Sequence, residues 1–273
     1  MGDAGHPKAR LSLWRDGTPT LGPETDPYGD FTAVSTTGIA VGSAHEGSQR
    51  RAVAFAYGRS LTLPLPAGAD ESAAAAVNAR GDVAGSVYAD GQPQRAGVWA
   101  PDGAALTLPT PPGFTFTAAT HIDDDGSVLG YAATGSPSMP ERTRLVVWAA
   151  DGTPRVLPTT GPVDPEPMMS PIDFHHGIVY GTQEGELVRW DLAARTTTVV
   201  DTGGAGGVEA VNAGGSMVLF GGFGQDGLVF VRDGVVRPLN DGGRWITPVA
   251  LTDDDLVFGR SNMNASPAYM DCR

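Results

Sequence analysis

A four-part unit recurs along the chain, and this repeat constrains the fold more than any other feature. Each copy has an Ala-Val-Asn-like segment, a Gly-x-Val-x-Gly-like segment, an apolar segment that usually ends in Trp or Phe, and a Leu-Pro ending. The clearest copies run from Ala33 to Pro64, from Ala76 to Pro109 and from His121 to Pro158. The spacing between equivalent glycines is close to the ~40–45 residues of a β-propeller blade.

The short apolar runs of each unit, separated by turn residues, predict strands. Asn78 to Gly81 and Asp123 to Gly126 predict tight turns between the first two strands of a unit, because Asn and Asp bond their own backbone and Gly accepts a positive φ. No long helical period appears, which excludes parallel α/β folds. Looser copies follow at 177–190, 210–239 and 249–270.

The two ends of the sequence predict how the sheets close. Leu11 to Trp14 and Thr20 to Leu21 match the last two strands of a unit, whereas the final copy shows the first two and no convincing fourth strand. A ring that completes its last blade with the N-terminal strands leaves no open sheet edge. The sequence therefore predicts one all-β domain over residues 1–273, a β-propeller of about six four-stranded blades, with five or seven as alternatives.

The repeat resembles that of the bacterial HAF family of extracellular propellers. That unit reads roughly Ala-x-x-Ile-Asn-x-x-Gly-x-Val-x-Gly, then an Ala-Phe-Leu-Trp-like strand, then Leu-Gly or Leu-Pro. Arg51-Ala52-Val53 and Arg95-Ala96-Gly97 stand here in place of the eponymous His-Ala-Phe. A weaker resemblance to propeller-type cyclases of polyketide and polyether biosynthesis implies a ring-forming enzyme.

Composition and charge exclude several classes of partner. The net charge is −13 with only 18 Lys and Arg, which argues against nucleic-acid binding. No apolar run approaches the ~20 residues of a membrane-spanning helix, and Met1 to Leu13 do not form a leader. We expect a cytoplasmic monomer, with a secreted protein as the alternative if a leader has been removed.

No metal, cofactor or disulfide is expected. The lone Cys272 has no partner for an intramolecular disulfide. Asp123 to Asp125 and Asp253 to Asp255 could suggest calcium, but consecutive residues point apart, and these runs occupy the position of Asn78 to Gly81 in the repeat. We interpret both as turns.

Positions at which one copy departs from the others are candidates for function. His121 stands where the other copies have Ala33, Ala76, Ala210 and Ala250. The alternative is a histidine that fills space and bonds a neighbouring carbonyl. With Tyr88, Tyr131 and Arg260, His121 forms our predicted catalytic set, since these groups could hydrogen-bond a carbonyl and stabilise developing charge.

The loops between the predicted strands are long, stiffened by proline and rich in aromatic residues and Met. Such loops on a rigid scaffold favour an apolar pocket with a few polar anchors, although each aromatic could instead pack beneath its own loop. The predicted substrate-binding residues are Phe31, His45, Glu71, Phe116, Met169, Glu209, Phe223, Trp245, Asn262 and Met263.

Two function classes remain open. The first is a cofactor-independent cyclase that holds a hydrophobic, polyketide-like intermediate in a central pocket for a cycloaddition-type ring closure. The second is a non-catalytic propeller that binds a small molecule, peptide or glycan. A lyase using His121 with Glu71 or Glu209 for acid–base chemistry is a further alternative, which requires these groups to lie within hydrogen-bond reach.

Overall fold

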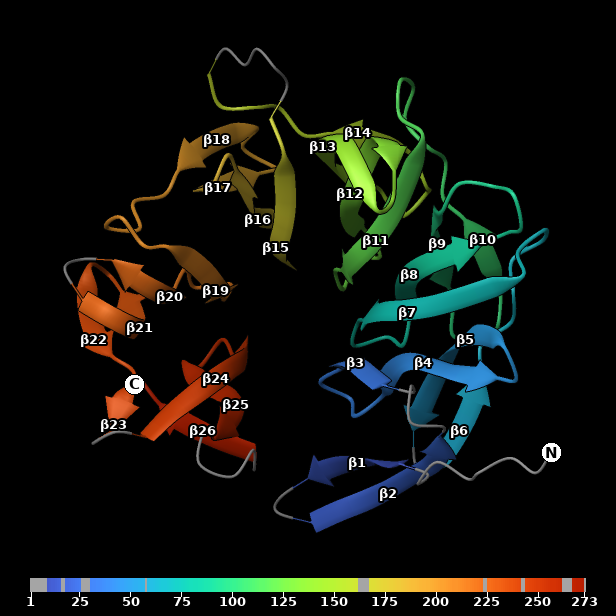
Figure 1. The fold of residues 1–273 in the computed structure, drawn as a ribbon, viewed down its shortest axis with the longest axis horizontal. Helices are drawn as coiled ribbons and strands as arrows, with labels where there is room; N and C mark the ends of the chain where they lie inside the picture. Colours follow the sequence, from blue (N-terminus) through green and yellow to red (C-terminus); the bar gives the residue numbers. More distant parts are fainter. Residues whose placement is uncertain are drawn as a thin grey trace. The chain divides into compact units, whose positions relative to one another are not determined.

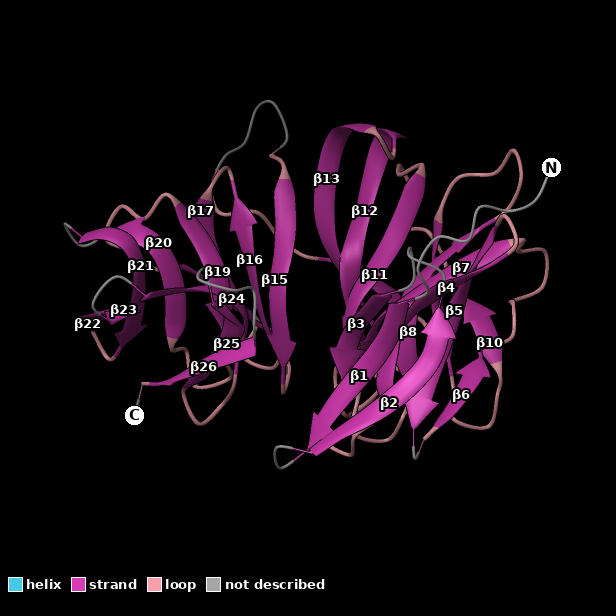
Figure 2. Ribbon diagram, turned by 60° about the horizontal axis from the view of Figure 1, so that its bottom comes forward, coloured by secondary structure: helices cyan, strands magenta, loops and turns pink. Residues whose placement is uncertain are grey.

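The chain folds into antiparallel sheets. The computed structural model describes residues 9–15, 18–25, 30–56, 58–161, 167–222, 225–241, 244–261 and 267–272. These residues form six four-stranded sheets and one two-stranded sheet, each built from strands consecutive in sequence (Figure 1). They contain strands, turns and loops and no helix that could cross a membrane (Figure 2). The fold is that of a six-bladed β-propeller, as the repeat predicts.

The chain divides into two compact units, Met1–Leu157 and Pro158–Arg273. The first unit holds a hairpin and three sheets: β1 (Ala9–Arg15), β2 (Thr18–Thr25), β3 (Asp30–Val34), β4 (Ala40–Glu46), β5 (Gln49–Ala56), β6 (Arg59–Thr62), β7 (Glu71–Val77), β8 (Val83–Tyr88), β9 (Arg95–Trp99), β10 (Ala105–Thr107), β11 (Phe116–Ile122), β12 (Val128–Ser136), β13 (Met139–Trp148) and β14 (Pro154–Val156). We refer to β3–β6, β7–β10 and β11–β14 as the first, second and third sheets.

The second unit holds the fourth, fifth and sixth sheets. Their strands are β15 (Met169–His175), β16 (Ile178–Gln183), β17 (Glu186–Asp191), β18 (Thr196–Val199), β19 (Gly207–Val211), β20 (Met217–Gly222), β21 (Gln225–Arg232), β22 (Val235–Pro238), β23 (Asn240–Asp241), β24 (Arg244–Leu251), β25 (Leu256–Ser261) and β26 (Pro267–Asp271). The sixth sheet draws its four strands from this unit, in the order β23-β24-β25-β26, and β1 pairs with β2. Closure by the N-terminal strands stays a prediction.

A β-bulge interrupts one strand of every four-stranded sheet at an equivalent point. The register shifts lie between Phe31 and Ala33, Ala74 and Ala76, Ala119 and His121, Pro171 and Asp173, Val208 and Ala210, and Pro248 and Ala250. A bulge leaves one residue unpaired and re-aims the side chain that follows it. His121 therefore shares its position with the alanines that the sequence aligned with it, and Asp173 is the fourth sheet's equivalent residue.

Buried tryptophans bond the Leu-Pro endings of the repeat, and in the first unit these bonds join consecutive sheets. Trp99, Trp148 and Trp190 are at most 1% exposed. Their indole N–H groups donate to the carbonyl oxygens of Pro64, Pro109 and Pro158, at 2.7, 2.8 and 2.8 Å. The two most regular parts of the repeat thus form one contact between neighbours, which explains why they recur together.

The predicted turns also carry bonds between sheets. The Oδ1 of Asn78 accepts the N–H groups of Arg80 and Asp82, and its Nδ2 donates to the carbonyl oxygen of Asp123 at 3.0 Å. Asp124 Oδ1 accepts the N–H of Ala79 at 2.9 Å. These bonds are turn chemistry, as the sequence predicts for Asp123 to Asp125.

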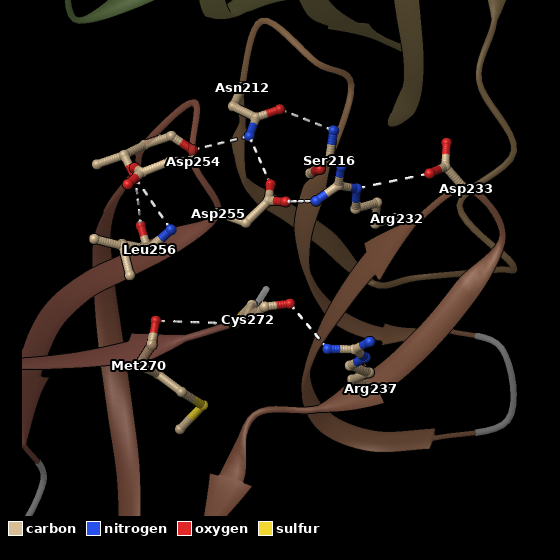
Figure 3. A network of polar contacts seen from close by, with 11 residues as sticks. Asn212, Ser216, Arg232, Asp233, Arg237, Asp254, Asp255, Leu256, Met270 and Cys272 are labelled. Atoms are coloured by element: carbon tan, nitrogen blue, oxygen red, sulfur yellow. Dashed lines mark hydrogen bonds and ion pairs between the residues drawn. The ribbon is translucent and has the colours of Figure 1, made fainter.

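The second unit repeats this arrangement at Asn212. Its Nδ2 donates to the carbonyl oxygen of Thr252 and to Asp255 Oδ1, at 2.9 and 3.0 Å, while its Oδ1 accepts the N–H of Ser216. Arg232 forms an ion pair with the other oxygen of Asp255, so Asn212 and Arg232 converge on one nearly buried carboxylate (Figure 3). The acidic run Asp253 to Asp255 thereby anchors the preceding turn.

Replacing Asn78 by alanine is expected to lower the free energy of unfolding by about 1–3 kcal/mol, because three backbone groups lose their partner. Urea denaturation measures this. Asn78→Asp isolates the donor, because it keeps the Oδ1 acceptor but sets a carboxylate against Asp82 Oδ2 and the Asp123 carbonyl oxygen, and it should destabilise the fold as well. Equal midpoints for Asn78→Ala and the wild type would contradict a structural role.

Candidate functional site

Four predicted site residues lie together in the second and third sheets: Glu71, Tyr88, Phe116 and Tyr131, which we call the tyrosine cluster. Glu71 and Tyr88 face each other in the β7–β8 pairing. The rings of Phe116 and Tyr131 meet edge to face, with centroids 6.4 Å apart and an interplanar angle of 89°. Strand β11 packs against β8, which brings the two halves of the cluster together.

The electrostatics of the cluster keep Tyr131 protonated. Burial raises the pKa of the Tyr131 phenol, and the neighbouring Tyr88 raises that pKa further. At neutral pH the hydroxyl group is therefore a hydrogen-bond donor. Such a donor can stabilise negative charge that develops on a ligand oxygen, whereas it is a poor proton acceptor.

A pocket adjoins the cluster at Tyr88. It has a volume of about 180 Å³, and Tyr88, Gln92, Pro93 and Arg95 are among the residues that line it. The guanidinium of Arg95 donates to Thr110 Oγ1 at 2.7 Å and to the carbonyl oxygen of Thr115 at 2.9 Å. These bonds fix a positive charge beside Tyr88, a combination that suits a carbonyl or carboxylate oxygen. The pocket is smaller than the ~300 Å³ of a typical drug-sized site, so it fits one end of a ligand.

Arg95 was not predicted as a site residue. The sequence contained a signal, because Arg95 replaces the histidine of the His-Ala-Phe repeat. Arg51 shows the same replacement in the first sheet, so the departure alone did not single out either residue.

His121 lies on β11 opposite Leu129, which is two residues from Tyr131 on β12. It is five residues beyond Phe116 on β11, which corresponds to roughly 16 Å along an extended strand. Its Nδ1 is 2.9 Å from Thr120 Oγ1. The grouping of His121 with Tyr88 and Tyr131 in one catalytic set therefore stays a prediction.

The remaining predicted residues are distributed over both units. Phe31 packs on Phe55, with centroids 5.9 Å apart, and His45 pairs with Arg50 across β4 and β5. Met169 is 1% exposed. Glu209 is the unpaired, exposed residue of the β19 bulge.

Five predicted residues lie, entirely or with their side chains, outside the part of the chain that the structure describes. Trp245 lies in β24 and Arg260 in β25, with side chains outside the described ones. Phe223, Asn262 and Met263 lie outside the described residues.

The pKa of Tyr131 gives a prediction on alkaline stability. Because this pKa is raised in the folded state, the folded protein keeps a proton that the unfolded chain loses above about pH 10. The associated stability is complete below that pH and is lost as the pH rises toward the folded-state pKa. Urea midpoints measured up to pH 11 should fall less steeply for Tyr131→Phe than for the wild type; parallel curves would contradict the raised pKa.

These sheets define the chain as a six-bladed β-propeller, and its candidate site is a pocket beside two tyrosines. No family model matches the sequence, and no curated protein matches it. Solved structures do match. Virginiamycin B lyase from Staphylococcus aureus superimposes with a TM-score of 0.57 at 13% identity, over 91% of this chain and 83% of that one.

Two further similar structures are of substituted proteins in complex with a ligand. A catalytically inactive variant of the virginiamycin B lyase from Staphylococcus aureus, with quinupristin, gives a TM-score of 0.54 at 14% identity, covering 92% of this chain and 84% of that chain. A mutant of puromycin hydrolase complexed with PGG gives 0.54 at 17% identity, covering 83% of this chain and 40% of that chain. At these identities the similarity shows the fold alone.

Proposed function

We propose that this propeller binds and processes an apolar small molecule that carries a carbonyl-type oxygen. The observation that carries the proposal is the tyrosine cluster beside a pocket: Tyr131 stays protonated, Tyr88 adjoins it, and Arg95 is held in place next to Tyr88. Together they offer hydrogen-bond donors and one positive charge to a ligand oxygen, while the buried Phe116 packs against the Tyr131 ring.

The similar solved structures support this class of function. Their names describe a lyase acting on virginiamycin B, here with quinupristin bound to an inactive variant, and a hydrolase acting on puromycin. A propeller of this kind therefore serves as a scaffold for small-molecule chemistry in other proteins.

The reaction we propose is cofactor-free ring formation on a polyketide-like intermediate. In a cycloaddition all bonds that form and break belong to the substrate, so no nucleophile, base or leaving group is required of the protein. Holding the reacting ends together can contribute roughly 7–11 kcal/mol. Donors such as Tyr131 stabilise charge that shifts onto the carbonyl oxygen. A lyase reaction would need a proton acceptor, for which the raised pKa makes Tyr131 unsuited, so that role would fall to Glu71 opposite Tyr88.

Turnover and binding can be tested together. The protein is incubated with a linear polyene or tetronate precursor, and the products are compared with those formed without protein. Faster ring closure or a changed product ratio supports the cyclase. Saturable binding that requires Tyr88 and Tyr131 but gives no product would establish the binding module instead, and neither binding nor turnover would overturn the proposal.

A further inference from the structure

A second, larger groove lies between the first and second sheets, away from the tyrosine cluster. Its volume is about 450 Å³, within the range of small-molecule sites. Ala54, Ala56 and Leu61 are among the lining residues from the first sheet, and Val83, Trp99 and Pro101 are among those from the second. Leu61 is 62% exposed. Most of the lining is apolar, and we call this feature the Arg59 groove.

Two arginines lie at this groove, and only one of the two is engaged in an ion pair with a described residue. Arg80 is bound by Asp82, with Nε and Nη2 at 2.9 and 2.7 Å from Oδ2. Arg59 begins β6, and its exposed side chain has no hydrogen bond or ion pair with any other described residue. The carboxylate of nearby Asp102 accepts the N–H of Ala104. Among the described residues, nothing neutralises the positive charge that Arg59 presents at the edge of this apolar groove.

The groove between the second and third sheets shows that this charge is not a feature of the repeat. That groove is smaller, about 230 Å³, and its lining includes the carboxylates of Asp82 and Asp151. Arg59 pairs with Ala56 at the end of the first sheet. In the second sheet the residue that corresponds to Arg59 is the uncharged Ala104, which bonds Ala100 as Arg59 pairs with Ala56. Of these two grooves, as far as the described residues line them, only the Arg59 groove combines a wide apolar surface with an unpaired cation.

We propose that the Arg59 groove binds an amphipathic monoanion, a carboxylate with an apolar chain. The chain would lie over Leu61, Ala54 and Pro101, where its burial is favourable, and the carboxylate would pair with the guanidinium of Arg59. The protein carries a net charge of −13 and repels anions in general. An anion that binds must therefore find a local positive charge, which Arg59 supplies.

The test compares decanoate with decanol, which share the apolar chain and differ in charge, by isothermal titration calorimetry. Decanoate is expected to bind more tightly than decanol. Arg59→Gln should weaken decanoate binding about three- to tenfold and leave decanol unchanged. Arg155→Gln removes a charge from another exposed arginine, on β14, and should behave as the wild type. Ala56→Phe should fill the groove and abolish binding of both compounds.

Equal affinities for the two compounds, or unchanged decanoate binding by Arg59→Gln, would overturn the proposal. Arg59 is exposed, so this variant is expected to fold even if Ala56→Phe does not. The inference is independent of the proposed function. If Tyr88→Phe and Tyr131→Phe weaken decanoate binding while Arg59→Gln does not, decanoate occupies the tyrosine cluster, and the Arg59 groove proposal is wrong while the proposed function stands.

Discussion

Replacing Trp148 by alanine should lower the free energy of unfolding by about 3–5 kcal/mol. Trp148 is fully buried and packs in a cluster with Ala84 and Leu108 of the second sheet and Val128 of the third. Removing the indole leaves a cavity between two sheets and deprives the carbonyl oxygen of Pro109 of its donor. Urea denaturation followed by circular dichroism measures the loss.

Two comparisons separate packing from hydrogen bonding in this result. Trp148→Phe keeps most of the ring volume but removes the N–H, and it should cost clearly less than alanine. Leu106→Ala truncates a residue that is 63% exposed on the neighbouring β10 and should have little effect. If Trp148→Ala unfolds at the wild-type urea concentration, the tryptophan–proline contact does not hold consecutive sheets together.

The second large effect is expected at the tyrosine cluster. In the proposed ring closure, Tyr131→Phe should lower kcat by about 10²–10³, the usual cost of one donor to a developing oxyanion. Tyr88→Phe should act in the same direction. Both substitutions keep the ring and remove only the hydroxyl group, so KM should change much less than kcat, because the donor acts mainly on the transition state.

A matched control tests whether the hydroxyl itself is responsible. Tyr180→Phe makes the same chemical change at a buried tyrosine of β16 and should leave kcat unchanged. Unfolding midpoints should be measured for all three variants. Loss of kcat in Tyr180→Phe to the same extent, or full activity in Tyr131→Phe and Tyr88→Phe together, would show that the cluster does not stabilise the transition state.

The repeat made most of the fold predictable because its recurrent positions contact each other between consecutive copies. Trp99 bonds Pro64, and Asn78 bonds Asp123. The residues of both pairs occupy positions that recur from one copy of the repeat to the next. The same comparison places His121 correctly against Ala33 and Ala76, since the bulge occurs at the same point in each strand.

The candidate site was predicted only in part because its geometry depends on which face of a strand each side chain occupies. Met169 came from a loop that looked exposed in sequence, yet it is 1% exposed. Asp173, which occupies the position equivalent to His121, was not predicted. Its copy of the repeat has no clear first segment, and the bulge that defines this position cannot be read from the sequence. Tyr88 and Tyr131 were predicted in one catalytic set with His121 and Arg260, and the packing of β11 on β8 shows how the two tyrosines come close to each other.

A crystal structure of the protein with a linear tetronate or polyene ligand bound is the most direct test of the proposed site. Our account predicts electron density beside Tyr88 and Tyr131, with a ligand oxygen within hydrogen-bond distance of both hydroxyl groups and the ligand reaching toward Arg95. A ligand bound elsewhere, with the tyrosine cluster unoccupied and its side chains unmoved, would contradict it.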